Sequence, residues 1–482
     1  MKKIYIPLLL LLIATQISFS QNLKRANYLF EKRAYLDAAK LFEDEDEKTQ
    51  DVYQKLGDCY FFNGKMQEAS DWYKILLTKF ENEVTPTYYY RYSQALKGIN
   101  NFAEADKWFQ KYNAQKHLVD GGNINTLSYF DALNTTIKRP YYVHKVDINT
   151  QGSDFGVSYY GDKVVFASTR DGGKIYDWNN LPYLDLYMAN VSDGNLTDVT
   201  PFSSSINTKM HESNAVFTKD GKTMYFTRNN FKDGKKGTDS NKISHLKIYK
   251  AQFVDGKWTN IMELPFNGEN YSVEHPALSP DEKELYFASD MPGSIGSFDI
   301  FVVDIHEDGT YGTPKNLGAK INTELREQFP FISKNNTLYF ASDGHFGLGG
   351  LDIFKSENKN GTFETPVNLS DNINSNVDDF AFVIDDTTET GYFASNRSGG
   401  VGNDDIYSFT QKKLYYVKGI AQDKNTLELL PGASISLLDA NKNVLATKIV
   451  GDDAAYSFEI ENNKNYTHCY LMHCKCKCPH CM

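Results

Sequence analysis

The sequence lacks several features that define common functional classes. Cysteine is scarce: Cys59 is the only one before position 469, and the other five lie within the last fourteen residues. The one long apolar run, residues 4–14, is too short to cross a bilayer. No Gly-x-Ser-x-Gly or His-Glu-x-x-His pattern occurs, so serine-hydrolase and zinc-protease chemistry are not supported. The formal net charge of −11 argues against a nucleic-acid partner.

Residues 1–20 have the composition of a secretory signal peptide. Lys2 and Lys3 precede the apolar run, and Ser18 and Ser20 supply small residues before a cleavage site at Gln21. We therefore expect an exported, periplasmic protein whose mature chain has no transmembrane segment. No cysteine follows the cleavage site, so a lipoprotein anchor is not expected.

The middle of the chain repeats one strand core five times. The copies are Val164-Val165-Phe166-Ala167-Ser168, Met224-Tyr225-Phe226-Thr227-Arg228, Leu285-Tyr286-Phe287-Ala288-Ser289, Leu338-Tyr339-Phe340-Ala341-Ser342 and Gly391-Tyr392-Phe393-Ala394-Ser395. The central phenylalanines are 60, 61, 53 and 53 residues apart. Such a period indicates one supersecondary unit used five times, and units of this kind must stack to bury their apolar faces.

Each repeat reads as four short strands separated by turn residues. Four antiparallel strands repeated radially make a β-propeller blade, so residues 140–412 predict a five-bladed β-propeller. The last unit stops after its third strand, near Gln411. We expect residues 141–146, which precede the first unit, to supply the missing outer strand and close the ring.

The two flanking regions have different periodicities. In residues 22–117, Leu56, Gly57, Ala69 and Tyr73 occur at the spacing of a tetratricopeptide repeat, which predicts a short helical solenoid. Such a solenoid either binds a protein segment on its concave face or acts as a spacer that orients the propeller. Residues 414–466 alternate as short strands with Gly and Pro turns, which predicts a small, incomplete β-sandwich.

These motifs carry family resemblances. The Ser279-Pro280-Asp281-Glu282-Lys283 turn with its following strand resembles the WD40-like repeat of TolB-type propellers, and residues 414–466 resemble a carboxypeptidase-regulatory-like domain. The order of the regions resembles the OmpA-family periplasmic proteins of Bacteroidetes, including components associated with type IX secretion and gliding. In that family a C-terminal OmpA-like domain binds peptidoglycan. No residues here match that domain, so peptidoglycan binding is not predicted.

Residues 467–482 form an anomalous tail rich in cysteine and histidine. Thiolate and imidazole at this density can bind Zn²⁺ or Cu⁺. The tail also interrupts the sandwich pattern after Asn465-Tyr466-Thr467. A frameshifted or truncated reading frame is the favoured explanation, and a genuine metal-binding tail is the alternative. We expect no metal or cofactor, and we interpret Cys59 as a small core residue.

Two sets of residues are candidate functional groups. Glu212, Glu274, Glu327 and Asp378 open the first strands of successive blades. They could ring the mouth of the propeller channel and hold a cation, or each could cap a turn or bond to the next blade. The other set lies in insertions of the first two blades. There the central phenylalanine and the third strand are 19 and 21 residues apart, against 12 in the other blades.

The insertions provide the predicted partner-binding residues: Tyr176, Trp178, Tyr183, Lys232, Lys235 and Lys236. Loop extensions on one face are where repeat proteins bind partners, although solvated, mobile loops are the plain alternative. We expect a partner with an acidic surface. The sequence thus predicts a non-enzymatic periplasmic scaffold, associated with the outer membrane, that binds envelope or secretion-system proteins. The alternative is a carbohydrate- or peptide-processing enzyme that uses the propeller channel.

Overall fold

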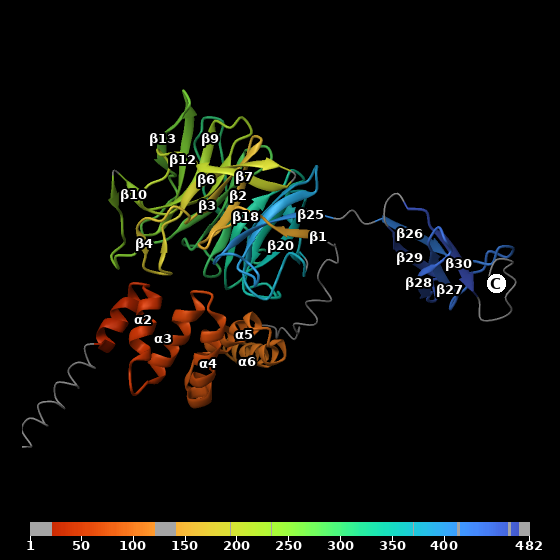
Figure 1. Ribbon diagram of the computed structural model, residues 1–482, viewed down its shortest axis with the longest axis horizontal. Coiled ribbons are helices and arrows are strands. Elements are labelled where there is room, and N and C mark those ends of the chain that lie inside the picture. Colours follow the sequence, from red (N-terminus) through yellow and green to blue (C-terminus); the bar gives the residue numbers. More distant parts are fainter. Residues whose placement is uncertain are drawn as a thin grey trace, which may run out of the picture. The chain divides into compact units, whose positions relative to one another are not determined.

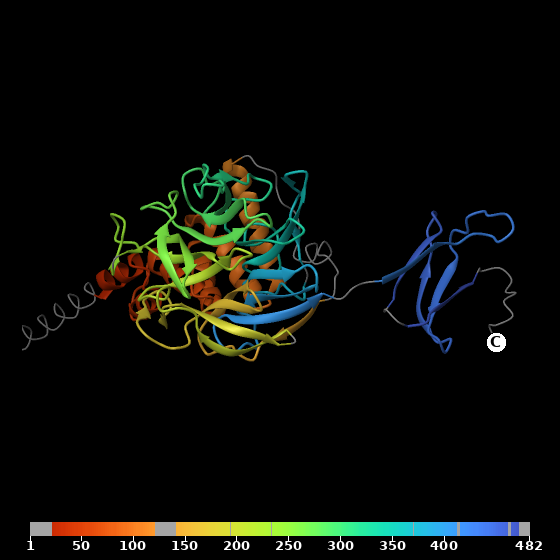
Figure 2. The same ribbon diagram turned by 90° about the horizontal axis from the view of Figure 1, so that it is seen from above.

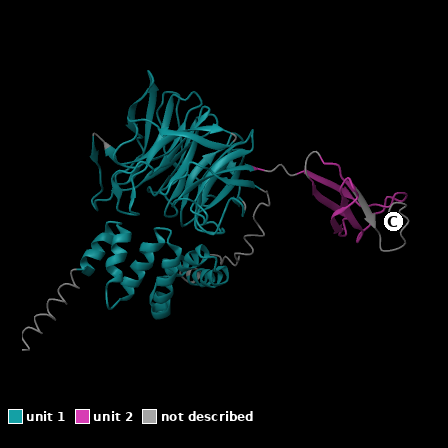
Figure 3. Cartoon of the chain, viewed as in Figure 1, with its two compact units in different colours: residues 1–410 teal, residues 411–482 magenta. Residues whose placement is uncertain are grey.

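The computed structural model describes residues 22–120, 141–192, 194–232, 234–369, 371–411, 415–460 and 464–471. The chain divides into two compact units, Met1–Thr410 and Gln411–Met482 (Figure 3). The expected signal peptide lies outside the described residues. Within the described ranges, no helix is long and apolar enough to cross a membrane.

The N-terminal part of the first unit is helical and forms consecutive hairpins. Residues 22–31 are helical and are followed by α2 (Tyr35–Glu43), α3 (Gln50–Phe61), α4 (Met66–Phe80), η1 (Glu81–Glu83), α5 (Thr87–Gly98) and α6 (Phe102–Asp120). A Cβ added at Gly57 would lie 2.2 Å from Tyr73 Cε1, so glycine is what lets the Tyr73 ring pack between α3 and α4. Tyr73 is fully buried, as is Cys59, which confirms the expected core position of Cys59.

The rest of the first unit is a five-bladed β-propeller (Figure 1). The first two blades are β2 (Asp154–Tyr160), β3 (Lys163–Ser168), β6 (Asp185–Ser192) and β7 (Asn195–Pro201); and β8 (Glu212–Phe217), β9 (Thr223–Asn229), β12 (Leu246–Val254) and β13 (Lys257–Glu263). The third is β14 (Val273–Leu278), β15 (Glu284–Ser289), β16 (Asp299–Asp304) and β17 (Lys315–Asn316). The fourth is β18 (Glu327–Ile332), β19 (Thr337–Ser342) and β20 (Asp352–Lys359), which pairs with β21 (Thr362–Phe363) and β22 (Val367–Asn368).

The fifth blade closes the ring with a strand from the start of the propeller. Its order is β1 (Tyr141–Lys145), β25 (Asp405–Gln411), β24 (Thr390–Ser395) and β23 (Asp379–Asp385). The expectation that residues 141–146 supply the outer strand is therefore confirmed. The five central phenylalanines of the repeat are at most 1% exposed, so they form the packed layer between blades.

The inner strand of every blade contains a β-bulge. A register shift occurs two residues into each strand, and one residue there has positive φ: Gly156 (71°), Asn214 (43°), His275 (56°), Phe329 (51°) and Ala381 (52°). A left-handed residue in a bulge bends a strand and increases its twist. The bulges therefore shape the axial channel, and only one of the five positions is glycine.

The second unit contains two small antiparallel sheets. One pairs β26 (Tyr415–Ile420) with β29 (Ala455–Ile460), and the other has the order β28 (Val444–Ile449), β27 (Ser434–Leu438) and β30 (Thr467–Leu471). An apolar cluster that includes Ile435, Leu437 and Phe458 joins residues of both sheets. Strand β30 extends the sheet five residues into the Cys/His-rich segment, and residues 472–482 lie outside the described residues.

Candidate functional site

Four of the five inner strands begin with a fully buried carboxylate. In each case a Thr or Ser four residues earlier donates both its backbone N–H and its hydroxyl to that carboxylate. The pairs are Thr150–Asp154, Thr208–Glu212, Thr323–Glu327 and Ser375–Asp379. Each carboxylate therefore fastens the turn that leads into its own blade.

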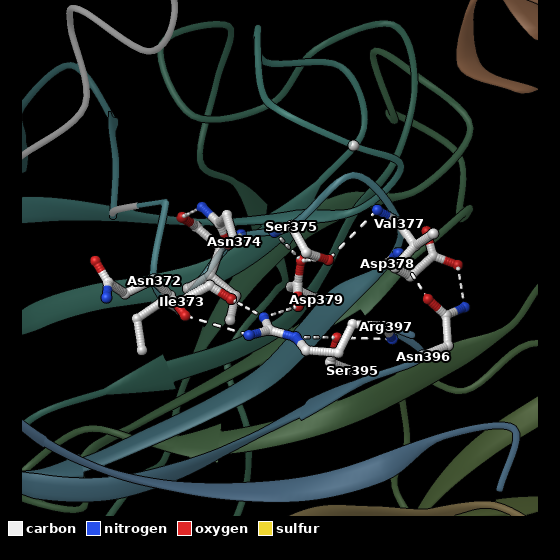
Figure 4. A network of polar contacts seen from close by, with 12 residues as sticks. Asn372, Ile373, Asn374, Ser375, Val377, Asp378, Asp379, Ser395, Asn396 and Arg397 are labelled. Carbon is white, nitrogen blue, oxygen red and sulfur yellow. Dashed lines mark hydrogen bonds and ion pairs between the residues drawn. The ribbon is translucent and has the colours of Figure 1, made fainter. Parts of the chain in front are cut away.

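A second donor completes each of these networks. Arg228 Nε lies 2.7 Å from Glu212 Oε1, and Arg170 and Arg397 bind Asp154 and Asp379 through Nη2 at 2.8 and 2.5 Å. In the fourth blade a hydroxyl, Ser342 Oγ, donates to Glu327 instead. Figure 4 shows the network of the fifth blade, where Arg397 also donates to backbone carbonyls of residues 372 and 373.

Burial controls the electrostatics of three of these carboxyl groups. It raises the pKa of Glu212 and of Glu327 to about 7 and raises the pKa of Asp379, while the hydrogen bonds and the arginines act in the opposite direction. Since their oxygens are engaged inside the blade, these groups serve the scaffold. Within the described ranges no group of three His, Cys, Asp or Glu side chains could hold a metal ion.

The expected ring of carboxylates is wrong in two of its four members. Asp379, not Asp378, occupies the position in the fifth blade, and Asp378 accepts a hydrogen bond from the Leu351 backbone at 2.8 Å. In the third blade the position is Val273, and Glu274 is one residue later. Glu274 Oε1 accepts from Gln328 Nε2 at 2.6 Å, and burial raises its pKa to about 7. For Glu212 and Glu327 the alternative of a capped turn is confirmed, and for Glu274 the alternative of a bond to the next blade is confirmed, since Gln328 lies in the fourth blade.

An asparagine latch joins each blade to the preceding one, and the sequence analysis missed it. One Asn side chain per blade bonds both the N–H and the C=O of a single residue in the third strand of the preceding blade, at 2.7–3.1 Å. The pairs are Asn149–Ile406, Asn207–Leu186, Asn267–Ile248, Asn322–Ile300 and Asn374–Ile353. The signal was an Ile-Asn-(Thr/Ser) triplet before four of the five inner strands.

The insertion of the first blade packs against the helical region of the same chain. It forms the hairpin β4 (Ile175–Tyr176) and β5 (Leu181–Pro182). Trp178 Nε1 donates to the carbonyl of Phe62 at 3.2 Å, and its ring meets Tyr35 edge-on at 5.0 Å. Tyr176 stacks on Trp178 at 6.4 Å, while Tyr183 lies 5.4 Å from Tyr176. Trp178 therefore contacts the helical region of its own chain through both its ring and its N–H.

The insertion of the second blade forms the hairpin β10 (Phe231–Lys232) and β11 (Lys235–Lys236). Lys235 and Lys236 are exposed, and the backbone of Lys232 pairs with that of Lys235. Further along the insertion, Lys32 of the helical region donates to the carbonyl of Asn241 at 3.1 Å. Both insertions therefore reach the helices, and the exposed lysines are the part directed to solvent.

The fourth and fifth blades contact the other end of the helical region. Lys97 is 3% exposed, and its Nζ donates to the carbonyl of Gly347 at 3.2 Å. Phe109 and Phe346 lie 5.4 Å apart, and Asn376 donates to the carbonyl of Gly98 at 2.7 Å. Figures 1 and 2 agree that the helices lie against one face of the propeller. The helices thus cover the face that carries the loops between second and third strands.

The axial channel contains a pocket of about 190 Å³, lined by the inner strands of all five blades. Its lining includes Ser158, Asn214, Phe217, His275 and Phe329. No Asp, Glu, Lys, Arg or Cys is among the described residues that line it. The lining comes from the middle and far ends of the strands, beyond the buried carboxylates. The pocket is therefore remote from the helices and almost free of ionisable groups.

Comparisons with known proteins add only distant similarities. A scan against protein-family models and a search of curated proteins each found no match. Among solved structures, a TolB from Agrobacterium tumefaciens is 12% identical, with TM-score 0.33, over 69% of this chain and 98% of that one. An α-L-arabinofuranosidase from Lactobacillus brevis is 13% identical, with TM-score 0.37, over 56% and 94%. PcrH bound to a region of PopB is 17% identical, with TM-score 0.19, over 22% and 85%. These TM-scores support no inference about function.

Proposed function

We propose that this protein is a non-enzymatic scaffold of the periplasm, associated with the outer membrane, that binds envelope or secretion-system proteins. The proposal rests mainly on where the acidic side chains of the propeller point and what they bind. Hydrolysis of a glycosidic or peptide bond needs ionisable groups that face the substrate. The carboxylates that open the inner strands are instead engaged inside their own blades, and none of the described residues that line the axial pocket is acidic.

The docking of the helical region supports a scaffold as well. Aromatic and polar contacts at both ends of the helical region fix it against the propeller. A rigid pair of domains presents several surfaces at fixed distances, which is what simultaneous binding of partners requires. In this proposal the helical region has the structure of a tetratricopeptide solenoid and keeps its concave face for protein segments. The signal-like residues 1–20 and the resemblance to OmpA-family proteins support the location.

The exposed lysines of the second insertion are the proposed contact of the propeller with a separate protein. Lys235 and Lys236 extend from the β10–β11 hairpin on a protein of net charge −11, so they favour an acidic partner surface. The intramolecular role of Trp178 and Tyr176 leaves these cations as the free part of the predicted site.

A pull-down from an envelope extract, with quantitative mass spectrometry, tests the proposal. The bait is the full chain, and the variant is Lys235→Glu/Lys236→Glu. The matched control is Lys257→Glu/Lys283→Glu, which reverses two exposed lysines outside the insertions. We expect the first pair to lose specific acidic envelope proteins that the control pair retains. Equal recovery by both variants would contradict the lysine contact. No enriched envelope protein with the wild type would contradict the scaffold.

A further inference from the structure

The first helix of each helical hairpin ends in the same left-handed turn. The residue that reverses the chain has positive φ in all three: Arg33 (61°), Gly64 (67°) and Asn100 (63°). The N–H of the next residue then bonds to the carbonyl five residues before it, as in Ala34 to Leu29, Lys65 to Tyr60 and Asn101 to Leu96. Glycine is usual at such a position and asparagine comes next, because most side chains clash with the backbone in the left-handed region. Arginine is therefore the costly choice, and of these three turns only the first has it.

The side chain that makes Arg33 costly lies against the propeller. Its guanidinium carbon is 5.7 Å from the centre of the Trp178 ring, and Trp178 is itself fixed by its bond to the Phe62 carbonyl. Arg33 is exposed, and within the described ranges its guanidinium has no hydrogen-bond or ion-pair partner. A guanidinium held over an aromatic ring keeps a planar fork of N–H donors free, which matches the geometry of a carboxylate. Arg33 is thus a preorganised cation where the helical region meets the propeller.

Lysines of both insertions lie close to one another at the same boundary. Lys174 precedes the β4–β5 hairpin, and Lys235 and Lys236 belong to the β10–β11 hairpin; all three are exposed. Burial and the neighbouring Lys174 lower the pKa of Lys236, while Asp177 acts in the opposite direction. None of the three lysines forms an ion pair with a described residue. The positive charges are therefore held together without a paired carboxylate.

Aromatic rings connect Arg33 to these lysines. Tyr176 stacks on Trp178 and lies 4.6 Å from His211. Burial raises the pKa of Tyr176 to about 12, and the Arg33 charge acts in the opposite direction. Burial, with Lys236 as the second cause, lowers the pKa of His211 to about 4. The cations of the helical region and of the second insertion act on adjacent rings, so they belong to one surface.

We propose that Arg33, Lys174, Lys235 and Lys236 together bind an acidic segment of a partner protein. One carboxylate of the segment pairs with the Arg33 fork, and others meet the lysines. The inference rests on the proposed function and deepens it, because it adds the helical region to the lysine contact. The site is complete only while the helices are docked, so docking and binding support each other.

Two features favour a protein segment over an anionic membrane. Asp177 lies close enough to Lys236 to act on its pKa, so a carboxylate stands among the cations. A sheet of lipid phosphates would be repelled by it, whereas a protein segment supplies backbone N–H groups as well as carboxylates. The net charge of −11 would also be repelled by an anionic bilayer, while a short segment meets only the local cations.

Fluorescence anisotropy on the full chain tests the binding. The probe is a fluorescein-labelled decaglutamate peptide, and decaglutamine is the uncharged control. Sedimentation with phosphatidylglycerol vesicles represents an anionic membrane. We expect decaglutamate to bind, with an affinity that falls as salt is added, and decaglutamine not to bind. Binding to the vesicles alone, equal binding of decaglutamine, or no binding of decaglutamate would overturn the proposal.

Matched single substitutions place the site. Arg33→Asn installs the residue that the third hairpin has at the equivalent turn, so the backbone is retained and the guanidinium is lost. We expect it to weaken decaglutamate binding about fivefold to tenfold, the effect of one charge-assisted contact. Lys174→Asn should have a similar effect without altering the turn. Lys74→Asn, which removes an exposed charge on α4, is the control and should change the affinity less than about twofold.

This proposal and the proposed function fail separately. Wild-type affinity in both Arg33→Asn and Lys174→Asn, with loss only in Lys235→Glu/Lys236→Glu, would refute the composite site and leave the lysine contact standing. Hydrogen exchange in α2 checks Arg33→Asn, because unchanged rates show that the helices stay docked. If exchange there is faster, the affinity of Lys174→Asn decides. Failure of the protein scaffold itself shows in the pull-down, which does not use the peptide.

Discussion

Trp178 provides the sharpest test of how the helical region and the propeller fit together. Its indole N–H donates to the Phe62 carbonyl at 3.2 Å, its ring packs edge-on against Tyr35, and Arg33 lies 5.7 Å from the ring centre. Replacement by alanine removes a hydrogen bond worth about 1 kcal/mol and an aromatic pair worth about 1 kcal/mol. Some apolar burial is lost too, so Trp178→Ala should weaken docking by about 2–3 kcal/mol.

Hydrogen exchange measures this loss where it occurs. Local opening governs exchange of amides at the contact, so 2–3 kcal/mol corresponds to roughly 30- to 150-fold faster exchange. The affected amides should lie in α2 and in the turn after α3. Amides of β15 and β19, which are in blades without an insertion, should keep their rates.

Two further variants isolate the cause. Trp178→Phe keeps a ring against Tyr35 and lacks the N–H, so its effect should fall between those of the wild type and Trp178→Ala. Tyr28→Ala removes a ring that is 58% exposed and should leave exchange in α2 unchanged. Wild-type exchange rates in Trp178→Ala would refute the reasoning, because they would mean that the insertion does not hold the helices.

Three other substitutions have definite expectations. Burial raises the pKa of Glu274 to about 7. The folded protein therefore keeps a proton that the unfolded chain loses from about pH 4.5, so the free energy of unfolding should fall as pH rises from 4.5 to 7. Glu274→Gln should reduce that fall by about 2 kcal/mol in urea titrations at pH 5 and 8, whereas exposed Glu307→Gln should not. Asn149→Ala breaks the latch that closes the ring and should lower the free energy of unfolding by about 2 kcal/mol. Faster amide hydrogen exchange should be confined to β25. Equally faster exchange in all blades would contradict a local latch. Lys97→Met removes a buried ammonium that donates to the Gly347 carbonyl and acts on the pKa of the buried Asp352, so the free energy of unfolding should fall by about 3 kcal/mol; an unchanged value would mean that the charge is not needed.

Period and composition were enough to predict the propeller. The five similar cores around a central phenylalanine gave the blade number, because stacked copies of one unit need similar buried residues at the same place. The truncated last unit, with the strand-like residues 141–146, predicted the closure that pairs β1 with β25. Gly57 and Tyr73 likewise predicted a close helix crossing, since only a residue without a side chain fits beneath the ring.

The candidate site could not be predicted in the same way. A loop insertion shows where symmetry is broken, but the residue that Trp178 meets lies more than a hundred positions earlier in the chain. Glu274 was misassigned because the third blade has one extra residue between its latch asparagine and its inner strand, which leaves Val273 where the other blades have an acid. In the fifth blade two adjacent aspartates, Asp378 and Asp379, compete for the position. The pocket depends on the backbone: five bulges with positive φ decide which side chains face the axis, and His275, Phe329 and Ala381 carry no such signal.

The positions at which one blade differs from the others are therefore the ones that point to contacts beyond the ring itself. The repeated elements, which are the carboxylate turns and the asparagine latches, are satisfied within the ring and hold it closed. The insertions of the first two blades and the Phe346 loop of the fourth bind the helices. Asn214 is a further departure, because its amide replaces the hydrogen of Gly156 and remains unsatisfied. The departures that contact the helices therefore hold the helical region against the ring, whereas the exposed Lys235 and Lys236 of the second insertion are the departures directed to solvent.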